Sequence, residues 1–379
     1  MDYAFGSQFE KDLHRDIKIL IETGYDRARD EAEFNDIALR LFRFQYENCE
    51  PYKRFCDSKN LTPTVVDKWE HIPALPADAF KYNDIACFPL EKAERVFMTS
   101  GTSDPQKRGR SYRDASNMEL FDAAVKAAYA QYLAPDDRRM KGILISPPPD
   151  FMPESPIMYD IGLLVDGFAT EAMYAIGRGG FDMGALLASL RQAEATGEPI
   201  IFGGASFGFI PFLDLCRAEG MSFRLPEGSR SVDGGGYKGR SRGLPKDEFI
   251  ALTSEILGIP DECIINLLGL TESASVYLDN VFMNRIRGVT DSRYKLNHPW
   301  TRTVVIDPET LREPVPRRLP KGERGILRHC DLANRSTVMA IQTEDIGYEI
   351  GDGFEIIERG TGIAGCSLAI EEYIEATNE

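Results

Sequence analysis

A cluster of hydroxyl residues and one glycine follows a short apolar run near residue 96, and Lys107 comes a few residues later. The cluster consists of Thr99, Ser100, Gly101, Thr102 and Ser103. Hydroxyl and backbone N–H groups can surround phosphate oxygens, glycine lets the backbone approach closely, and lysine neutralises charge. The segment has neither the G-x-x-x-x-G-K-[ST] nor the G-x-G-x-x-G spacing. It is therefore a candidate phosphate loop of another kind, and the alternative is an ordinary Ser/Thr/Gly/Pro turn.

The first ninety residues contain no comparable cluster. Apolar residues at helical spacing predict helices over residues 9–58. Several prolines then predict an irregular segment over residues 60–90, which leads into a first core strand at Arg95–Met98.

A repeated theme follows: an apolar run, then a loop of Gly, Pro or Ser, then a helical stretch. Apolar runs lie at 95–98, 142–145, 199–202, 231–233 and 263–268, and helical stretches at 114–133, 182–196, 206–219 and 245–257. Ser206 is expected to cap one of these helices. Alternating strands and helices predict an α/β fold with a mostly parallel sheet flanked by helices. Ligands bind beyond the carboxyl ends of such strands, so we expect the hydroxyl loop, Gly234–Gly236 and Gly269–Glu272 to converge on one ligand.

Short β-like runs from about residue 284 predict a small β-subdomain, with strands at 303–306, 325–327, 338–342 and 354–357. We expect four parts in total. They are a helical and irregular segment at 1–90 packed on the core, an α/β core at 91–283, the β-subdomain at 284–358, and a short tail at 359–379 that carries Cys366.

Composition excludes several classes of function. The 379 residues are 43% hydrophobic, which is ample for a core, and the net charge is -16. Acidic surfaces disfavour nucleic acid and anionic membranes as main partners. The sequence shows no signal-like N-terminus and no run long enough to span a membrane, so we expect a cytoplasmic protein. Seven cysteines without CxxC pairs and four dispersed histidines favour reduced thiols over disulfides or a zinc site.

Four segments in order resemble motifs of the adenylate-forming superfamily, and within it the acyl-protein synthetases of bacterial luminescence fatty-acid reductases. Thr99–Ser103 resembles the hydroxyl-rich phosphate loop, with Lys107 where a lysine usually follows. Gly269-Leu270-Thr271-Glu272 is similar to the aromatic-Gly-x-Thr-Glu motif, although Leu268 replaces the aromatic residue. Thr343-Glu344-Asp345 resembles the Thr-Gly-Asp ribose motif with a departure at Glu344, and Lys321–Leu327 resembles the Gly-Glu-x-Gly strand entry.

The resemblance implies ATP and Mg²⁺ as cofactors and assigns roles to individual residues. Thr99–Ser103 would hold the β- and γ-phosphates, with charge from Lys107 or from Arg108, Arg110 or Arg113. Glu272 would hold Mg²⁺, and Thr271 would bond the α-phosphate. The nucleoside would contact Asp345 and Arg359 at the ribose, and Gly234, Gly235, Gly236 and Tyr237 at the base. Gly269 would be a further cofactor-binding residue.

The resemblance also implies where the acyl group goes. Most members of the superfamily have a mobile C-terminal domain with a catalytic lysine, whereas this sequence ends twenty residues after Arg359, so that domain is expected to be absent. The acyl-protein synthetases resemble this truncated plan and carry an acyl-accepting cysteine near the C-terminus. Cys366, between Gly365 and Ser367, matches it.

Three functions remain open at this point. The first is ATP-dependent activation of a carboxylic acid, with transfer to Cys366 as a thioester for a reductase partner. The second is an adenylating ligase that delivers the acyl group to coenzyme A or an acyl-carrier protein, and the third is a catalytically silent nucleotide-binding scaffold. The acyl length is not predicted, because candidate pocket residues could equally be core; they are Phe151, Met152, Ile157, Met158, Phe207 and Phe209.

Overall fold

The computed structural model describes residues 4–99, 107–235 and 243–359. Backbone contacts divide the chain into two compact units, each assembled from separate stretches. Unit 1 comprises Met1–Ala124, Leu270–Ser275 and Tyr294–Glu379, and unit 2 comprises Val125–Gly269 and Val276–Arg293. The predicted domain boundaries at residues 90, 283 and 358 stay a prediction.

Unit 1 begins with three helices, which confirms the helical prediction for residues 9–58. They are α1 (Gln8–Thr23), α2 (Glu31–Asn48) and α3 (Glu50–Ser58). Helix α1 begins where the Ser7 hydroxyl accepts a hydrogen bond from the Glu10 N–H, and α2 begins where the Asp30 carboxylate accepts from Ala32 and Glu33. The apolar face of α1 is buried as its helical spacing predicts.

The segment that follows α3 is irregular, as predicted, but it contains short elements that matter for the site. They are η2 (Trp69–His71), β1 (Leu75–Pro76), η3 (Ala77–Lys81) and η4 (Leu90–Lys92). Strand β1 pairs in parallel with β15 (Ala340–Ile350), with Pro76 opposite Gln342. The chain therefore enters η3 beside the part of β15 that follows Gln342.

The sheet of unit 1 is mainly antiparallel, in the order β12-β16-β15-β14-β13. All four predicted β-runs after residue 300 are strands, although β15 continues eight residues beyond the predicted end. The bounds are β12 (Lys295–Leu296), β13 (Thr301–Ile306), β14 (Gly325–Asp331) and β16 (Gly353–Arg359).

The first predicted core strand was assigned to the wrong sheet. Among the described residues, strand β2 (Ala93–Met98) pairs only with β3 (Arg110–Asp114), in an antiparallel two-stranded sheet of unit 1. Only residues 99–109 separate the two strands, which is too short for the crossover of a dozen or more residues that a parallel pair needs. The hydroxyl loop therefore connects a hairpin and does not follow a strand of the parallel sheet. Helix α4 (Ala115–Ala128) begins directly after β3.

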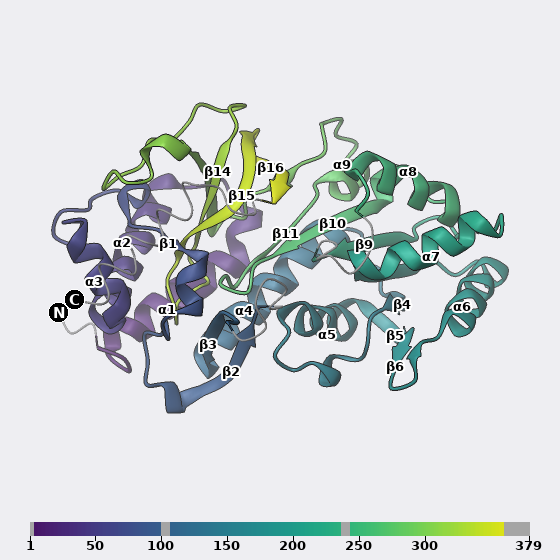
Figure 1. Cartoon of the computed structure of the whole chain (residues 1–379), viewed down its shortest axis with the longest axis horizontal. Coiled ribbons are helices and arrows are strands. Elements are labelled where there is room, and N and C mark those ends of the chain that lie inside the picture. The colour runs from purple at the N-terminus through teal and green to yellow at the C-terminus, as the bar shows by residue number, and fades with distance from the viewer. Residues whose placement is uncertain (1–3, 100–106, 236–242, 360–379) are drawn as a thin grey trace. The chain divides into compact units, whose positions relative to one another are not determined.

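Unit 2 contains the predicted α/β sheet (Figure 1). The order of its strands is β11-β10-β9-β8-β4-β5. All neighbours are parallel except β10 and β11, which form a hairpin. The strands are β4 (Met140–Ile145), β5 (Ala169–Tyr174), β8 (Ile200–Ala205), β9 (Arg230–Gly234), β10 (Ile264–Gly269) and β11 (Val276–Leu278). The helices are α5 (Pro156–Phe168), α6 (Met183–Thr196), α7 (Ser206–Ala218), α8 (Lys246–Leu257) and α9 (Val281–Arg287), and a small ladder joins β6 (Ile176–Gly177) to β7 (Gly180–Phe181).

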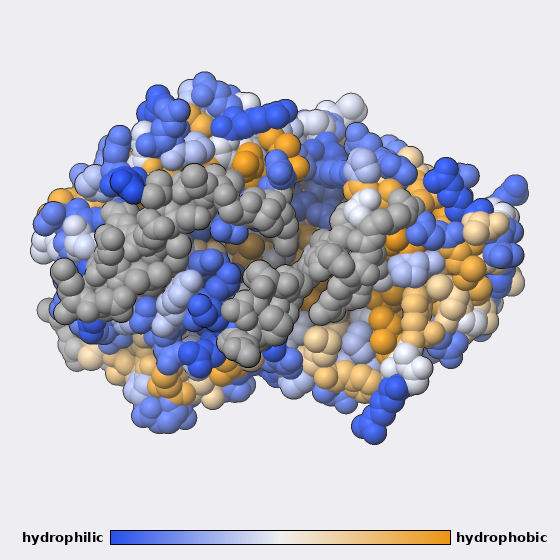
Figure 2. Space-filling view, viewed as in Figure 1, coloured by the Kyte–Doolittle hydropathy of each residue, from blue (hydrophilic) through white to orange (hydrophobic). Residues whose placement is uncertain are grey.

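The net charge of -16 predicts a polar surface. On the face seen in Figure 2, charged and polar residues surround smaller apolar areas. Within the described ranges, no helix is both long enough and apolar enough to cross a membrane.

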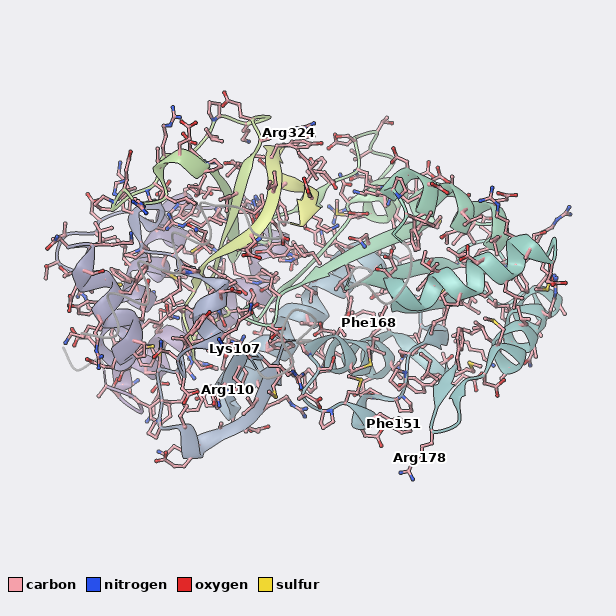
Figure 3. The ribbon with its side chains drawn as sticks, viewed as in Figure 1. Lys107, Arg110, Phe151, Phe168, Arg178 and Arg324 are labelled. Carbon is pink, nitrogen blue, oxygen red and sulfur yellow. The ribbon has the colours of Figure 1, made fainter. Side chains whose placement is uncertain are left out.

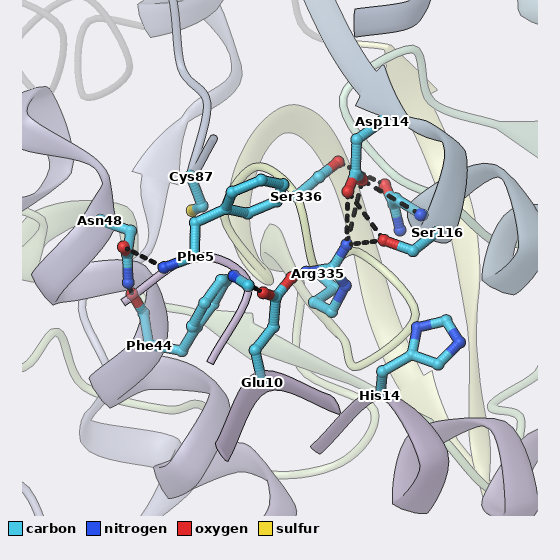
Figure 4. A network of polar contacts seen from close by, with 12 residues as sticks. Phe5, Glu10, His14, Phe44, Asn48, Cys87, Asp114, Ser116, Arg335 and Ser336 are labelled. Carbon is cyan, nitrogen blue, oxygen red and sulfur yellow. Dashed lines mark hydrogen bonds and ion pairs between the residues drawn. The ribbon is translucent and has the colours of Figure 1, made fainter. Parts of the chain in front are cut away.

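A buried ion-pair network joins the first helix to the chain after β14 (Figure 4). The Arg335 guanidinium donates to both carboxylate oxygens of Asp114, at 3.0 and 2.8 Å, and also to Glu10 and to the Ser116 hydroxyl. All three charged side chains are buried. In the same region the Gln45 side-chain amide donates a hydrogen bond to the Asn334 carbonyl and accepts one from the Met339 N–H. The segment 331–339 thus anchors α1, α2 and β3.

Replacing Arg335 with Met should lower the free energy of unfolding by about 3–5 kcal/mol, because two carboxylates would remain buried without their cation. Urea unfolding measures the loss. Arg40→Met is the control, since Arg40 pairs with Asp16 at 2.8 Å near the surface and should cost less than about 1 kcal/mol. Equal losses in the two variants would contradict the importance of this network.

Candidate active site

The turn Leu270–Ser275 contains Thr271 and Glu272 and is fixed by one buried carboxylate. The chain leaves β10 at Gly269 and returns in β11 at Val276. Asp331, at the end of β14, accepts hydrogen bonds from the Ser273 hydroxyl at 2.7 Å, the Ala274 N–H at 3.0 Å and the Ser275 hydroxyl at 2.9 Å. These bonds hold three consecutive residues of the turn, so the backbone at Glu272 has little freedom.

Arg113 supports the same turn from β3. Its guanidinium is fully buried and donates to the Ser273 carbonyl at 2.9 Å, the Asn117 side chain at 2.9 Å, and the Asn334 side chain. Asn334 in turn donates to the Glu272 carbonyl at 2.8 Å. Burial lowers the pKa of Arg113 to about 10. Arg113, one of the cations considered for the phosphates, is therefore committed to holding the turn.

Glu272 is a buried carboxyl group that titrates near neutral pH. Burial raises its pKa to about 7, the charge of Asp78 acts in the same direction, and Lys81 and Arg113 oppose it. A divalent cation could replace the proton, because carboxylate oxygen is a preferred ligand of Mg²⁺. The described ranges hold no group of three or more His, Cys, Asp or Glu side chains arranged to bind a metal. A Mg²⁺ ion held by Glu272 would need further oxygen ligands.

Strand β15 carries Thr343, Glu344 and Asp345, the predicted ribose motif. Asp345 is buried, and its N–H donates to the Thr343 hydroxyl at 3.1 Å, which itself donates to the Leu327 carbonyl. Burial raises the pKa of Glu344, as do the charges of Asp78 and Asp345, whereas Lys81 lowers it. The carboxyl groups of Glu272 and Glu344 thus share two charged neighbours.

Those neighbours lie on η3, which sequence reasoning missed. Asp78 and Lys81 are three residues apart, and side chains at this spacing eclipse each other in a 3₁₀ helix. Their carboxylate oxygen and ammonium nitrogen are 2.6 Å apart. The Asp-x-x-Lys spacing was visible in the sequence, but it lies in a proline-rich segment from which we expected no regular structure.

Element η3 also adjoins the base of the hydroxyl loop. A side chain at Gly109 would meet the Thr99 methyl carbon at 3.1 Å and the Phe80 Cβ at 3.6 Å. The Thr99 N–H donates to the Gly109 carbonyl at 3.0 Å, and the Thr99 hydroxyl accepts from the Gly109 N–H at 2.8 Å. Thr99 therefore closes the loop. Ser100, Gly101, Thr102 and Ser103 lie outside the described residues.

The other predicted phosphate cations lie on or beside this hairpin (Figure 3). Lys107 is exposed, with its Nζ 5.9 Å from the centroid of the Tyr82 ring. Arg110 pairs with Asp84 at 2.9 Å, and Arg108 donates to the Thr99 carbonyl at 2.6 Å.

In unit 2, Gly234 and Gly235 lie at the carboxyl end of β9. A side chain at Gly234 would meet the Leu267 carbonyl at 3.1 Å, and Gly235 has a left-handed φ of +84°. The Ser206 hydroxyl does not cap α7 as predicted, because it donates to the Asp233 carboxylate at 2.7 Å. Asp233 also accepts from the Asn266 amide at 3.0 Å. This network ties the carboxyl ends of β8 and β9 to the middle of β10.

Two of the possible acyl-pocket residues are core residues. Met158 and Phe209 are buried, and Phe209 packs against Phe202 and Phe249 with ring centroids 5.1 and 5.7 Å apart. Phe151 is 41% exposed, with the Arg178 guanidinium carbon 6.0 Å from the centroid of its ring (Figure 3), and Met152 is 38% exposed. A side chain at Gly234 or Gly235 would meet the Ile157 Cδ1 atom, at 3.4 or 3.3 Å. The side chain of Phe207 is not among those described.

The structure groups the predicted site residues by unit. Unit 1 contains Thr99, Lys107, Thr271, Glu272 and Asp345, and unit 2 contains Gly234, Gly235 and Gly269. Gly236, Tyr237, Cys366 and the side chain of Arg359 lie outside the described part of the chain. Convergence of the two groups on one ligand stays a prediction.

Comparison with known proteins gives one family match and several similar structures. The family model of the acyl-protein synthetase, LuxE, matches residues 19–373. A long-chain-fatty-acid–luciferin-component ligase from Vibrio harveyi is 23% identical over 349 residues, which are 89% of this chain and 87% of that protein.

Solved structures with the same fold include adenylate-forming ligases. A 2-hydroxyisobutyryl-CoA ligase in complex with 2-HIB-AMP and CoA, in its thioesterification state, has a TM-score of 0.60 and 16% identity, with 87% of this chain and 69% of that one covered. The open conformation of the same ligase has a TM-score of 0.59 and 14% identity, with 84% of this chain and 65% of that one covered. ATP-bound MatB from Rhodopseudomonas palustris has a TM-score of 0.50 and 14% identity, with 72% of this chain and 49% of that one covered. The chain thus has the fold of the large domain of these ligases and spans about half to two-thirds of their length.

Glu272 should make stability fall as the pH rises through neutrality. Its pKa is 4.5 in an unfolded chain and about 7 in the fold, so the folded state binds more protons between these values. The free energy of unfolding should therefore drop by up to about 3 kcal/mol between about pH 5 and about pH 8. Glu272→Gln should lack this drop. Urea unfolding of both proteins across this range measures the difference, and parallel curves would contradict the raised pKa.

Proposed function

Because the chain belongs to the acyl-protein synthetase family, LuxE, it is a ligase, and we propose that it activates a carboxylic acid by transfer of AMP from ATP. A carboxylate oxygen forms a bond to the α-phosphorus, the bond from that phosphorus to the β-bridging oxygen breaks, and pyrophosphate leaves. The product is an acyl-adenylate. The observation that carries this proposal is the buried Glu272 in a Gly-x-Thr-Glu turn, with its carboxyl group titrating near neutrality.

The residues of unit 1 have the chemistry that the reaction needs. Glu272 would hold Mg²⁺, which when bound offsets negative charge on the phosphates. Thr271, next to it and half exposed, would donate to an α-phosphate oxygen. Asp345 would accept from the ribose hydroxyls, and the hydroxyl loop would bond the β- and γ-phosphates. The Asp331 and Arg113 contacts would keep the turn in one position throughout, so no binding energy is lost to ordering it.

The substrate we propose is a fatty acid. The Vibrio harveyi relative is named a long-chain-fatty-acid ligase and matches 89% of this chain. Apolar side chains of unit 2 near Gly234, such as Ile157, could contact the alkyl chain.

The acyl acceptor we propose is Cys366, with a reductase partner receiving the group afterwards. The Cys366 thiolate forms a bond to the acyl carbon, the bond from that carbon to the phosphate oxygen breaks, and AMP leaves. The thiol proton goes to solvent. The other six cysteines of the sequence are buried. Burial raises the pKa of Cys216 to about 11 and that of Cys330 to about 12, so these two thiols are poor nucleophiles at neutral pH.

Incubation with radiolabelled fatty acid, ATP and Mg²⁺ should label the wild-type protein covalently, and hydroxylamine should release the label. Cys366→Ser should abolish this thioester, whereas Cys216→Ala should keep it because Cys216 is buried. Pyrophosphate exchange should persist in Cys366→Ser and fall at least about 100-fold in Glu272→Gln, which loses a charged ligand of the metal.

Other outcomes separate the alternatives. Acyl-CoA or acyl-carrier formation that does not depend on Cys366 would favour an adenylating ligase with an external thiol. ATP binding without pyrophosphate exchange over acids of many lengths would identify a silent nucleotide-binding scaffold.

A further inference from the structure

Lys81 is a partly exposed cation at a place where four carboxyl groups gather. It is 24% exposed and pairs with Asp78, which is 35% exposed, so both side chains reach solvent. The buried neighbours on the same short helix, Ala79 and Phe80, fix η3 in the fold. The ammonium group is therefore on a rigid element and open to a ligand.

Strand pairing explains why η3 lies at the candidate site. Strand β1 runs parallel to β15, and the register ends with Pro76 opposite Gln342. Residues 77–81 consequently begin where β15 continues into Thr343, Glu344 and Asp345, and η3 contacts both β15 and β3. Element η3 thus adjoins the predicted ribose motif on one side and, through Phe80 and Gly109, the base of the hydroxyl loop on another.

Charge in this part of unit 1 is unbalanced. Asp78, Glu272, Glu344 and Asp345 interact electrostatically with one another or with Lys81, and Lys81 favours the ionised forms of both glutamates. A nucleotide would add several more negative charges. An anion can be bound here only where a cation with free donors faces it.

The cations first considered for this role have other contacts. Arg113 is buried in the turn that holds Glu272, and Arg110 pairs with Asp84. Lys107 lies over the Tyr82 ring. Lys81 differs from them because its charge acts on both Glu272 and Glu344. Unlike Arg113, whose charge also acts on Glu272 but which is fully buried, Lys81 is partly exposed.

We propose that Lys81 is a catalytic residue that contacts the phosphates of ATP beside Glu272, and that Asp78 holds its ammonium group in place until the nucleotide binds. This inference rests on the proposed function. During adenylation no proton moves at Lys81. Its charge stabilises the negative charge that grows on the α-phosphate oxygens and the leaving pyrophosphate as the acyl oxygen–phosphorus bond forms.

The test measures ATP affinity by equilibrium dialysis with EDTA, so that no metal contributes, and pyrophosphate exchange with Mg²⁺ and fatty acid. Lys81→Met should weaken ATP binding by about 10- to 100-fold, the value of one charge-assisted contact. Lys81→Arg should recover most of the affinity. Added salt should weaken binding to the wild type more steeply than to Lys81→Met.

Two further variants separate a role in binding from damage to the fold. Lys141→Met is the matched control, because Lys141 is 25% exposed and pairs with Glu171 at 2.9 Å; its ATP affinity should equal that of the wild type. Asp78→Asn removes a negative charge and releases Lys81, so ATP should bind about threefold tighter or more. A merely structural role for the Asp78–Lys81 pair predicts the opposite sign.

Each remaining outcome decides one of the two proposals. Wild-type affinity in Lys81→Met would overturn the role of Lys81 even if exchange is observed in the wild type. ATP binding without exchange would overturn the proposed function, while the Lys81→Met affinity would still decide the contact. A wild-type protein that binds no ATP would overturn both.

Discussion

The buried carboxylate of Asp331 is the interaction on which the candidate site depends. A carboxylate in the interior is costly unless hydrogen bonds satisfy it, and here four groups do so: the hydroxyls of Ser273 and Ser275 and the N–H groups of Ala274 and Ala333. Those donors come from two segments more than fifty residues apart, so the carboxylate fixes the turn to the end of β14. The flanking strands β10 and β11 belong to unit 2, whereas the turn itself belongs to unit 1. The position of Glu272 is therefore set by the β-sheet of unit 1 and not by the strand that precedes it.

That arrangement explains how a strongly acidic protein can handle an anionic ligand. The chain carries sixteen more negative than positive charges, and long-range attraction cannot bring a nucleotide to it. Binding must come from local contacts. Burial raises the pKa of both Glu272 and Glu344, to about 7 for Glu272. The Glu272 carboxyl group is therefore partly protonated near neutral pH, which reduces its repulsion of phosphate. Lys81 opposes this effect of burial, because its positive charge lowers the pKa of both carboxyl groups. An ionised carboxylate can in turn bind a metal cation. The pKa values of the two glutamates thus depend on two opposing effects: burial raises them, and the partly exposed ammonium group of Lys81 lowers them.

The sequence predicted the elements of this site better than their arrangement. Apolar runs before Gly203 and Gly269 identified two of the parallel strands, because buried strands need continuous apolar residues. The hydroxyl loop was assigned to the same sheet, although a short connection forces β2 and β3 into a hairpin. Asp78 and Lys81 were missed since their importance comes from the β1–β15 pairing, a contact between residues far apart in the chain. The role expected for Ser206 failed for a similar reason: Asp233, on another strand, competes for its hydroxyl. Roles expected for Cys366 and Tyr237 concern residues outside the described ranges and remain predictions.

The discontinuity of unit 1 has a consequence for synthesis of the chain. Arg335 bonds Glu10 across 325 residues of sequence and Asp114 across 221, so the first 124 residues cannot complete their packing until the last part of the chain has left the ribosome. The strands and helices of unit 2 all precede residue 294 and can associate earlier. Contacts between distant parts of a chain slow folding, and apolar surface exposed in the meantime promotes aggregation. The apolar faces of α1 and α2 are therefore the surfaces that need protection while the ribosome completes the protein.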